Sequence, residues 1–245
     1  MRALVVLPTY NEAENIDDML RALRHMVPSA DVLVVDDNSP DGTGEIADGA
    51  AADLGHIEVL HRSGKLGLGA AYREGFKRAF DAGYEAVVSM DSDFSHDPVV
   101  IPEMLRRLEQ GADVAIGSRY VAGGGTLHWP LHRRLLSKWG NRYTGWALGI
   151  PVRDCTSGFR AYRASSLAAV DPAGTTAEGY AFLTELVQRL SRASAQIVEV
   201  PIVFRDRTRG QSKMSGAIIL ESMVLVTKWG LRDRWTRVAR RIGRG

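Results

Sequence analysis

The sequence predicts an α/β protein in which helices flank a mostly parallel, doubly wound sheet. In the first half of the chain, short runs rich in β-branched residues alternate with segments of helical spacing, a pattern typical of strands joined by crossover helices. The composition, 45% hydrophobic and 24% charged, is that of a globular protein with a sizeable core. The predicted strands are residues 3–7, 32–36, 57–61, 86–90 and 113–117, and the predicted helices are residues 14–25, 44–54, 69–81 and 102–110.

The second half of the chain is less regular. It contains a basic, aromatic helix candidate, a glycine turn leading into a short strand, a further helix and strand, and a final amphipathic helix. No repeat or low-complexity linker divides the sequence. We predict one domain over residues 1–210, followed by an amphipathic helix and a basic tail over 211–245. The elements expected before that tail are helix 131–148, strand 157–162, helix 182–192 and strand 197–204.

Charge, cysteine content and hydrophobic runs indicate the cellular compartment in which the protein is expected to act. The formal net charge is only +2, so attraction to anions depends on where the basic residues cluster. A single cysteine, Cys155, cannot form an intramolecular disulfide, which favours a reducing compartment. The N-terminal apolar run is too short for a signal peptide, and the apolar run 216–226 is shorter than the ~20 residues of a spanning helix. We expect no transmembrane helix and a cytoplasmic setting.

The strongest local motif is Asp91-Ser92-Asp93, directly after the predicted strand 86–90. Two carboxylates at this spacing can present oxygens to one hard cation, and magnesium typically takes only one or two protein carboxylates beside waters and substrate phosphates. The alternative is that the aspartates cap the helix that begins near Pro98. Ser95 or Asp97 could provide that cap instead, which would leave the aspartates for a metal.

Polar residues also follow the first two predicted strands. The segment 36–43 has the composition of a turn that opens a helix, and we assign Asp37 to a ligand and Asp41 to the turn and cap. After the first strand, Tyr10 can stack on a base and Glu12 can accept a hydrogen bond from it. An acidic first turn of a helix explains that segment equally well.

A glycine-rich turn, residues 64–69, follows the third predicted strand. Its spacing matches neither the P-loop nor the dinucleotide-binding fingerprint, so the sequence does not indicate a kinase or a dehydrogenase. Lys65 in this turn is placed to approach a phosphate.

Taken in order, the motifs 8–12, 36–43, 65–69, 91–93 and 117–120 resemble those of the inverting GT-A (Rossmann-like) glycosyltransferases of family 2. Residues 153–160 and 204–213 resemble the later motifs of the same family, so the likeness covers nearly the whole chain. More narrowly, the sequence resembles the polyprenol or dolichol monophosphomannose synthases. The resemblance implies a metal-dependent enzyme that transfers mannose from GDP-mannose to a polyprenol phosphate with inversion.

The resemblance also implies roles for particular residues. Asp91 and Asp93 would bind Mg²⁺ or Mn²⁺, with Ser95 where some relatives carry a glutamine ligand. Arg207 and Lys213 would reach the donor diphosphate, and Arg119 would act in catalysis. The acceptor phosphate would lie near Arg119, Arg133 and Ser137. The residues expected to hold the donor nucleotide are Pro8, Tyr10, Glu12, Val35, Asp37, Lys65 and Ser92.

Two regions indicate a membrane surface as partner. Residues 128–146 interleave tryptophan with arginine and lysine, a mixture suited to the headgroup level of a bilayer, although the aromatics could instead be core residues. Residues 228–245 hold seven basic residues against one acid. We expect peripheral attachment on the cytoplasmic face, or a separate membrane-embedded partner protein. No nucleic-acid-binding fold accompanies the basic tail, so we expect no nucleic acid.

Other functions remain open at this stage. The same scaffold could use a UDP-sugar to transfer glucose or aminoarabinose to a polyprenol phosphate, or could serve a soluble acceptor. A noncatalytic protein that binds a nucleotide sugar or a lipid is a further alternative. Glu185 lies where related enzymes place a base. Because a phosphate monoester is already anionic at neutral pH, we expect Glu185 only to position other groups.

Overall fold

The computed structural model describes residues 1–177, 179, 181–206 and 216–242. Its centre is a seven-stranded sheet in the order β3-β2-β1-β4-β7-β5-β8, in which only β7 runs antiparallel to its neighbours. The sheet is therefore mostly parallel, as predicted. Its strands are β1 (Ala3–Thr9), β2 (Asp31–Asp36), β3 (Ile57–His61), β4 (Ala86–Ser89), β5 (Val114–Ser118), β7 (Arg160–Arg163) and β8 (Ile197–Pro201).

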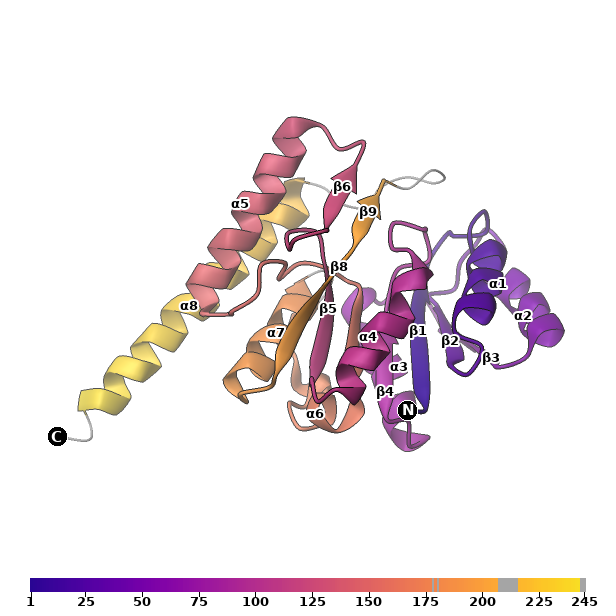
Figure 1. The fold of residues 1–245 in the computed structure, drawn as a ribbon, viewed down its shortest axis with the longest axis horizontal. Coiled ribbons are helices and arrows are strands. Elements are labelled where there is room, and N and C mark those ends of the chain that lie inside the picture. The colour runs from indigo at the N-terminus through magenta and orange to yellow at the C-terminus, as the bar shows by residue number, and fades with distance from the viewer. Residues whose placement is uncertain (178, 180, 207–215, 243–245) are drawn as a thin grey trace.

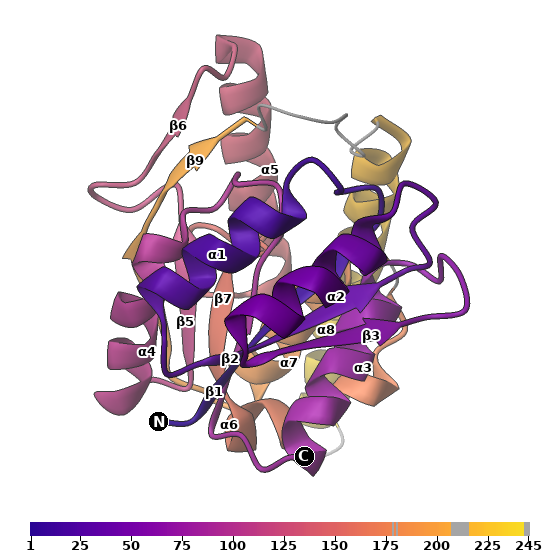
Figure 2. The same ribbon diagram turned by 90° about the vertical axis from the view of Figure 1, so that its right-hand side faces the viewer.

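Helices cover both faces of this sheet (Figures 1 and 2). Strand residues alternate between two cores: Leu4 and Val6 face one, and Val5 and Leu7 face the other. The first core is closed by α3 (Leu68–Asp81), α6 (Ala164–Ala168) and α7 (Ala181–Arg192), and the second by α1 (Ile16–Met26), α2 (Thr43–Leu54) and α4 (Ile101–Glu109). Two short 3₁₀ helices, Pro98–Val100 and Pro172–Gly174, complete this part of the chain.

The predicted strand 197–204 is wrong as a single element. It divides into β8 in the main sheet and β9 (Val203–Arg205), which pairs in parallel with β6 (Gly125–Leu127) in a separate two-stranded sheet. Between them, the Ile202 N–H donates to the Ser118 carbonyl at the end of β5. The alternating pattern marks extended chain but does not say which neighbour pairs with it. The predicted strand 157–162 also shifts, because pairing with β4 begins only at Arg160.

Two long helices, α5 (Leu131–Leu148) and α8 (Gly216–Ile242), lie side by side at one end of the sheet (Figure 1). The Tyr143 and Thr227 hydroxyls lie 2.7 Å apart, and a Cβ at Gly230 would sit 2.7 Å from the Ala147 carbonyl oxygen. Gly230 therefore lets the two backbones approach closely. Asp233 of α8 accepts a hydrogen bond from Gln188 of α7 at 2.8 Å. The last helix is thus anchored to the body.

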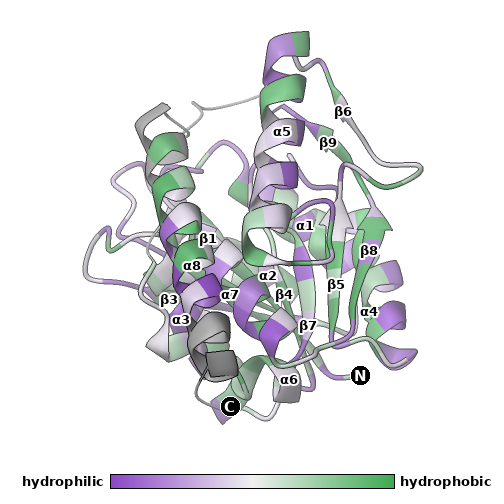
Figure 3. Ribbon diagram, turned by 90° about the vertical axis from the view of Figure 1, so that its left-hand side faces the viewer, coloured by the Kyte–Doolittle hydropathy of each residue, from purple (hydrophilic) through white to green (hydrophobic). Residues whose placement is uncertain are grey.

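Within the described part of the chain, no helix is long and apolar enough to cross a membrane. Hydrophobic and hydrophilic positions both occur along α5 and α8 (Figure 3). The predicted division at residue 210 falls in 207–215, outside the described residues.

Candidate active site

The carboxyl ends of β1, β2 and β4 meet at one edge of the sheet. From β1 the chain continues to β2 and β3 on one side and then returns to β4 on the other side, so a topological switch lies between β1 and β4. Ligands of open α/β sheets bind at such switches. The register pairs Pro8 with Val35, so the predicted nucleotide residues of two strands are brought together.

The turns beyond β1 and β2 are held by two aspartates, of which Asp36 is buried and Asp41 is exposed. Asp36 accepts hydrogen bonds from the Thr9 hydroxyl at 2.9 Å and from the Ser39 N–H and hydroxyl at 3.0 and 2.6 Å. Asp41 accepts from the Ala13 N–H at 3.1 Å and from the Thr43 N–H and hydroxyl at 3.1 and 2.6 Å. The assignment of Asp41 to the turn is confirmed, whereas the N-cap residue of α2 is Gly42, without a side-chain cap hydrogen bond.

Asp37 has a partner that the sequence analysis missed. The Arg62 guanidinium, nearly buried, forms an ion pair with Asp37 and extends its Nε to Glu74 at 3.1 Å. Arg62 directly follows β3, so its place at a strand end was the signal that could have revealed it. The pair fixes the orientation of Asp37 at the rim of the site.

Lys65 and Tyr10 come from loops that follow different strands and meet at the same edge. The Lys65 ammonium lies 4.1 Å from the centre of the Tyr10 ring, a cation–π arrangement. An aromatic face and a cation at one place suit a nucleotide, whose base stacks and whose phosphates carry negative charge. Glu12, nearby in sequence, is buried and accepts from the Asn15 amide at 3.0 Å.

The carboxylate pair follows β4 as predicted, but its two members differ. Asp91 is about one-third exposed (36%), whereas Asp93 is buried and accepts from the Ser95 N–H at 3.0 Å. The cap of the Pro98–Val100 helix is Asp97, which accepts from the Val99 N–H at 3.1 Å. The capping alternative for Asp91 and Asp93 is therefore wrong.

The donor set of this loop fits a hard divalent cation. The described residues hold no cluster of three or more His, Cys, Asp or Glu side chains suited to a metal. Mg²⁺ is typically bound by one or two protein carboxylates, while substrate phosphates and water complete its coordination. The side chain of Ser95 is buried beside them, and its role as a ligand stays a prediction.

His96 is a second residue that the sequence analysis missed. Its ring is buried, packs 5.3 Å from the Phe159 ring and 5.4 Å from the Phe204 ring, and places Nδ1 3.8 Å from an Asp91 oxygen. Burial lowers the pKa of His96 to about 4; Asp93 opposes the shift and Arg119 adds to it. The ring is therefore neutral at neutral pH and adds no positive charge beside the carboxylates.

The Arg119 side chain is 9% exposed and forms an ion pair with the fully buried Asp154. Its Nε and Nη2 donate to the two Asp154 oxygens at 2.7 Å each, and Nη2 also donates to the Thr156 hydroxyl at 2.9 Å. Burial alone would lower the pKa of Arg119, but the charge and hydrogen bonds of Asp154 outweigh it and raise the pKa. Asp154, missed by the sequence analysis, thus keeps a buried guanidinium charged.

The three predicted acceptor residues gather around two aromatic rings. The Arg133 guanidinium lies 4.1 Å from the centre of the Trp129 ring, and that of Arg119 lies 5.7 Å from it. The Tyr120 hydroxyl donates to the Ser137 hydroxyl at 2.7 Å. Trp129 Nε1 is buried and has no hydrogen-bond partner among the described residues. Arg133 itself is about one-third exposed and pairs with Asp206 at 2.7 Å.

The remaining predicted residues fall into two groups. Glu185 is buried and accepts from the N–H groups of Thr176 and Ala177 at 3.0 and 2.9 Å, and from Arg189 at 2.8 Å. Its carboxylate therefore holds the loop before α7. Arg207 and Lys213 lie outside the described residues, and their contacts with the donor stay predictions.

Comparison with known proteins agrees with this geometry. The family described as Glycosyl transferase family 2 matches residues 4–170. Undecaprenyl-phosphate mannosyltransferase of Micrococcus luteus is 46% identical over 243 residues, covering 99% of this chain and all of the relative. Polyprenol monophosphomannose synthase of Mycolicibacterium smegmatis is 46% identical over 237 residues, covering 96% of this chain and 89% of the relative.

Solved structures share the fold at lower identity. Glucosyl-3-phosphoglycerate synthase of Mycobacterium tuberculosis in complex with phosphoglyceric acid has a TM-score of 0.72 at 19% identity, covering 93% of this chain and 79% of that chain. A mannosyltransferase from Pyrobaculum calidifontis in complex with GDP-Man and Mn²⁺ has a TM-score of 0.60 at 16% identity, covering all of this chain and 76% of that one. The fold is GT-A, as predicted.

Proposed function

The chain belongs to glycosyl transferase family 2, and on this basis we propose that it transfers mannose from GDP-mannose to a polyprenol phosphate with inversion at the anomeric carbon. The observation that carries the proposal is the Asp91 and Asp93 pair at the same sheet edge as Tyr10 and Asp37. Two relatives at 46% identity, named for mannosyl transfer to a polyprenyl phosphate or for monophosphomannose synthesis, support the choice of sugar and acceptor.

The donor nucleotide lies, in this proposal, across the ends of β1 and β2. Tyr10 stacks on the guanine, and Asp37, oriented by Arg62, accepts hydrogen bonds from the nucleoside. Lys65, held over Tyr10, faces the diphosphate. The other predicted nucleotide residues are Pro8, Glu12, Val35 and Ser92.

Asp91 and Asp93, with Ser95 beside them, are the residues that would hold Mg²⁺ or Mn²⁺. The ion would neutralise charge on the departing diphosphate. Asp93, fixed by the Ser95 N–H, supplies a carboxylate of defined orientation, whereas Asp91 is the more exposed of the two. Arg207 and Lys213 stay predicted contacts of the diphosphate.

The acceptor phosphate is proposed to lie near Arg119, Arg133 and Ser137. Phosphate monoesters have a second pKa of ~6 and are anionic at neutral pH, so no strong general base is needed. An acceptor oxygen attacks the anomeric carbon, the bond to the diphosphate oxygen breaks, and its electron pair leaves with GDP. Arg133 can exchange its exposed partner Asp206 for the phosphate, while Arg119 remains bound to Asp154.

We place this reaction on the cytoplasmic face of a membrane, where GDP-mannose and a lipid phosphate meet. The chain would attach there peripherally through its basic C-terminal residues or through a separate membrane-embedded protein. The mixed hydrophobic and basic surface of α5 supports peripheral attachment.

The proposal is tested by supplying labelled donors to purified protein with polyprenol phosphate, detergent and Mg²⁺ or Mn²⁺. GDP-mannose should give a labelled lipid, whereas UDP-glucose, and GDP-mannose with unphosphorylated polyprenol, should give none. Transfer from UDP-glucose alone would overturn the sugar assignment. Nucleotide-sugar binding without transfer to any acceptor would favour a noncatalytic binding protein.

A further inference from the structure

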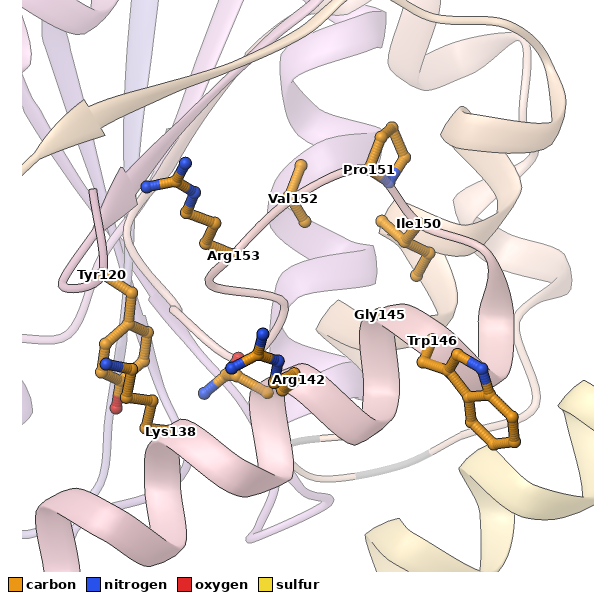
Figure 4. A pocket seen from close by; sticks show the side chains of 10 residues that line it. Tyr120, Lys138, Arg142, Gly145, Trp146, Ile150, Pro151, Val152 and Arg153 are labelled. Atoms are coloured by element: carbon orange, nitrogen blue, oxygen red, sulfur yellow. The ribbon is translucent and has the colours of Figure 1, made fainter. Parts of the chain in front are cut away.

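A basic pocket of about 540 Å³ opens beside α5 on the outside of the domain (Figure 4). Lys138 and Arg142 project from α5, and Arg153 projects from the loop that follows it. Tyr120 and Ile150 contribute to the walls. We call this cavity the α5 pocket. Its size is sufficient for a phosphate-bearing headgroup.

The α5 pocket is lined by positively charged side chains that have no acidic partner among the described residues. Neither Lys138 nor Arg142 nor the Arg153 guanidinium forms an ion pair within the described residues, and no acid lines the cavity. Two acids close to Arg153 are already engaged: Asp154, its neighbour in sequence, binds Arg119, and Glu199 accepts from the backbone N–H of Arg153 at 2.9 Å. Lys138, Arg142 and Arg153 are exposed, so these three cations at the cavity are accessible to an anion from outside the protein.

The same face of α5 is hydrophobic at the surface. Positions 131, 135, 138, 139, 142 and 146 recur at helical spacing and share one side of the helix. Four of them are apolar and more than half exposed: Leu131 (69%), Leu135 (59%), Trp139 (57%) and Trp146 (67%). The other two are Lys138 and Arg142, so the cations of the pocket and the exposed apolar residues face one direction.

Helix α8 extends this surface. The Arg234 guanidinium lies 4.5 Å from the centre of the Trp146 ring, and Trp235 is 76% exposed. Tryptophan beside arginine, on a helix with an exposed apolar face, is typical of the interfacial region of a bilayer. The apolar stripe alone fits several occupants. The unpaired cations among the exposed tryptophans favour an anionic lipid.

We propose that the α5 pocket binds the phosphate headgroup of an anionic membrane phospholipid, while the exposed leucines and tryptophans of α5 enter the interface. The pocket adjoins the acceptor site at Tyr120, which lines the pocket and donates to Ser137, but Lys138 and Arg142 lie on another side of α5 from Arg133 and Ser137. The proposed binding is independent of sugar transfer.

The test measures binding of the full chain to lipid vesicles without donor or metal. Wild type and the triple variant Lys138→Gln, Arg142→Gln, Arg153→Gln are sedimented with phosphatidylcholine vesicles that contain or lack phosphatidylglycerol. A matched control, Arg21→Gln, Lys77→Gln, Arg106→Gln, removes the same charge from α1, α3 and α4, and thermal unfolding verifies that each variant is folded. The single variant Arg142→Glu supplies a milder change of the pocket.

Each basic side chain near an anionic surface contributes about fivefold to the partition coefficient. We expect the triple variant to lose roughly 100-fold of its binding to anionic vesicles, Arg142→Glu to lose at least fivefold, and the control triple to stay within about threefold of wild type. Equal binding by wild type and the pocket variants would overturn the proposal. So would wild-type binding that ignores phosphatidylglycerol, or binding of inorganic phosphate without any binding of vesicles. The vesicle assay contains no sugar donor, so its result does not depend on whether the proposed transfer reaction is correct.

Discussion

Two regions of the molecule differ in how their polar and apolar groups are paired. One is the edge formed by the ends of β1, β2 and β4, where the donor is proposed to bind (the donor edge). The other is the exposed surface of α5 and α8 (the α5–α8 surface). At the donor edge, aspartates accept hydrogen bonds from nearby groups: the buried Asp36 from Thr9 and Ser39, and the exposed Asp41 from Ala13 and Thr43. On α5, leucine and tryptophan side chains are more than half exposed, and Lys138 and Arg142 have no ion-pair partner within the described residues. The polar groups of the donor edge are therefore satisfied within the protein, whereas the α5–α8 surface can still accept an apolar and anionic partner.

In the function proposed here, the two regions meet ligands from two different phases, water and the membrane. A soluble nucleotide sugar requires a site already formed by the protein, because each polar contact must be in place before the ligand arrives. A lipid phosphate stays in the membrane, so the protein surface that approaches it can remain hydrophobic. The Arg119–Asp154 pair is largely buried, like Asp36, and lies close to the ring of Trp129, just before α5.

The largest expected effect is at the carboxylate pair. Asp93→Asn removes the charge of the buried carboxylate, and we expect kcat/KM for transfer to fall by roughly 1000-fold, the loss typical of removing several kcal/mol of charge stabilisation. Asp97→Asn is the matched control, because Asp97 only caps the following 3₁₀ helix. Its activity should stay within a few-fold of wild type. Equal losses in both variants would contradict a metal role for Asp93.

The next effect compares a buried ion pair with an exposed one. Asp154→Ala leaves the Arg119 charge buried without its partner and should lower the free energy of unfolding by about 3–5 kcal/mol. Asp206→Ala removes the partner of the more exposed Arg133 and should cost less than about 1 kcal/mol. Urea denaturation of the two variants measures the difference. Equal losses of unfolding free energy in the two variants would show that the buried Arg119–Asp154 pair contributes no more to stability than the exposed Arg133–Asp206 pair.

A smaller effect is expected at the residue that orients Asp37. Arg62→Ala removes a charged hydrogen-bond donor, and such bonds are worth about 1.5–3 kcal/mol. The KM for the donor should therefore rise by roughly 10- to 100-fold, with a much smaller change in kcat. Glu74→Gln, which alters only the outer partner of Arg62, is the control. A loss confined to kcat would show that Arg62 serves the chemistry instead of the donor.

The smallest effect concerns the turn that begins α2. Asp41→Ala removes the acceptor of two backbone N–H groups and should destabilise the fold by about 1–2 kcal/mol. Because Asp41 holds the turn and does not bind the nucleotide in this account, the KM for GDP-mannose at 25 °C should change little. A large rise in KM without loss of stability would place Asp41 in the nucleotide site. It would contradict its assignment to the turn alone.

The sequence predicts the donor edge well because its information is local. Polar residues that directly follow parallel strands reach the same sheet edge whatever the details of packing, so Tyr10, Asp37, Asp91 and Asp93 could be named together. The roles of Asp41 and Asp97 also follow from short-range turn chemistry.

Long-range partners could not be predicted in the same way. Arg62 meets Asp37 across 25 residues and Asp154 meets Arg119 across 35, and no spacing rule connects them. Hydrophobicity does not reveal that His96 is buried between two phenylalanine rings. Nor does the alternation of residues 197–204 indicate that the chain changes sheets at Ile202. These contacts depend on how separate elements pack.

The central claim is a single displacement in which a lipid phosphate attacks GDP-mannose at the edge formed by β1, β2 and β4. It is tested most directly by the anomeric configuration of the mannosyl phosphate made by wild-type protein, measured by nuclear magnetic resonance. GDP-mannose carries an α-linked sugar, so one displacement with inversion predicts a β-linked mannosyl phosphate. An α-linked product would contradict the account, because retention requires a different chemical path from the one proposed for this site.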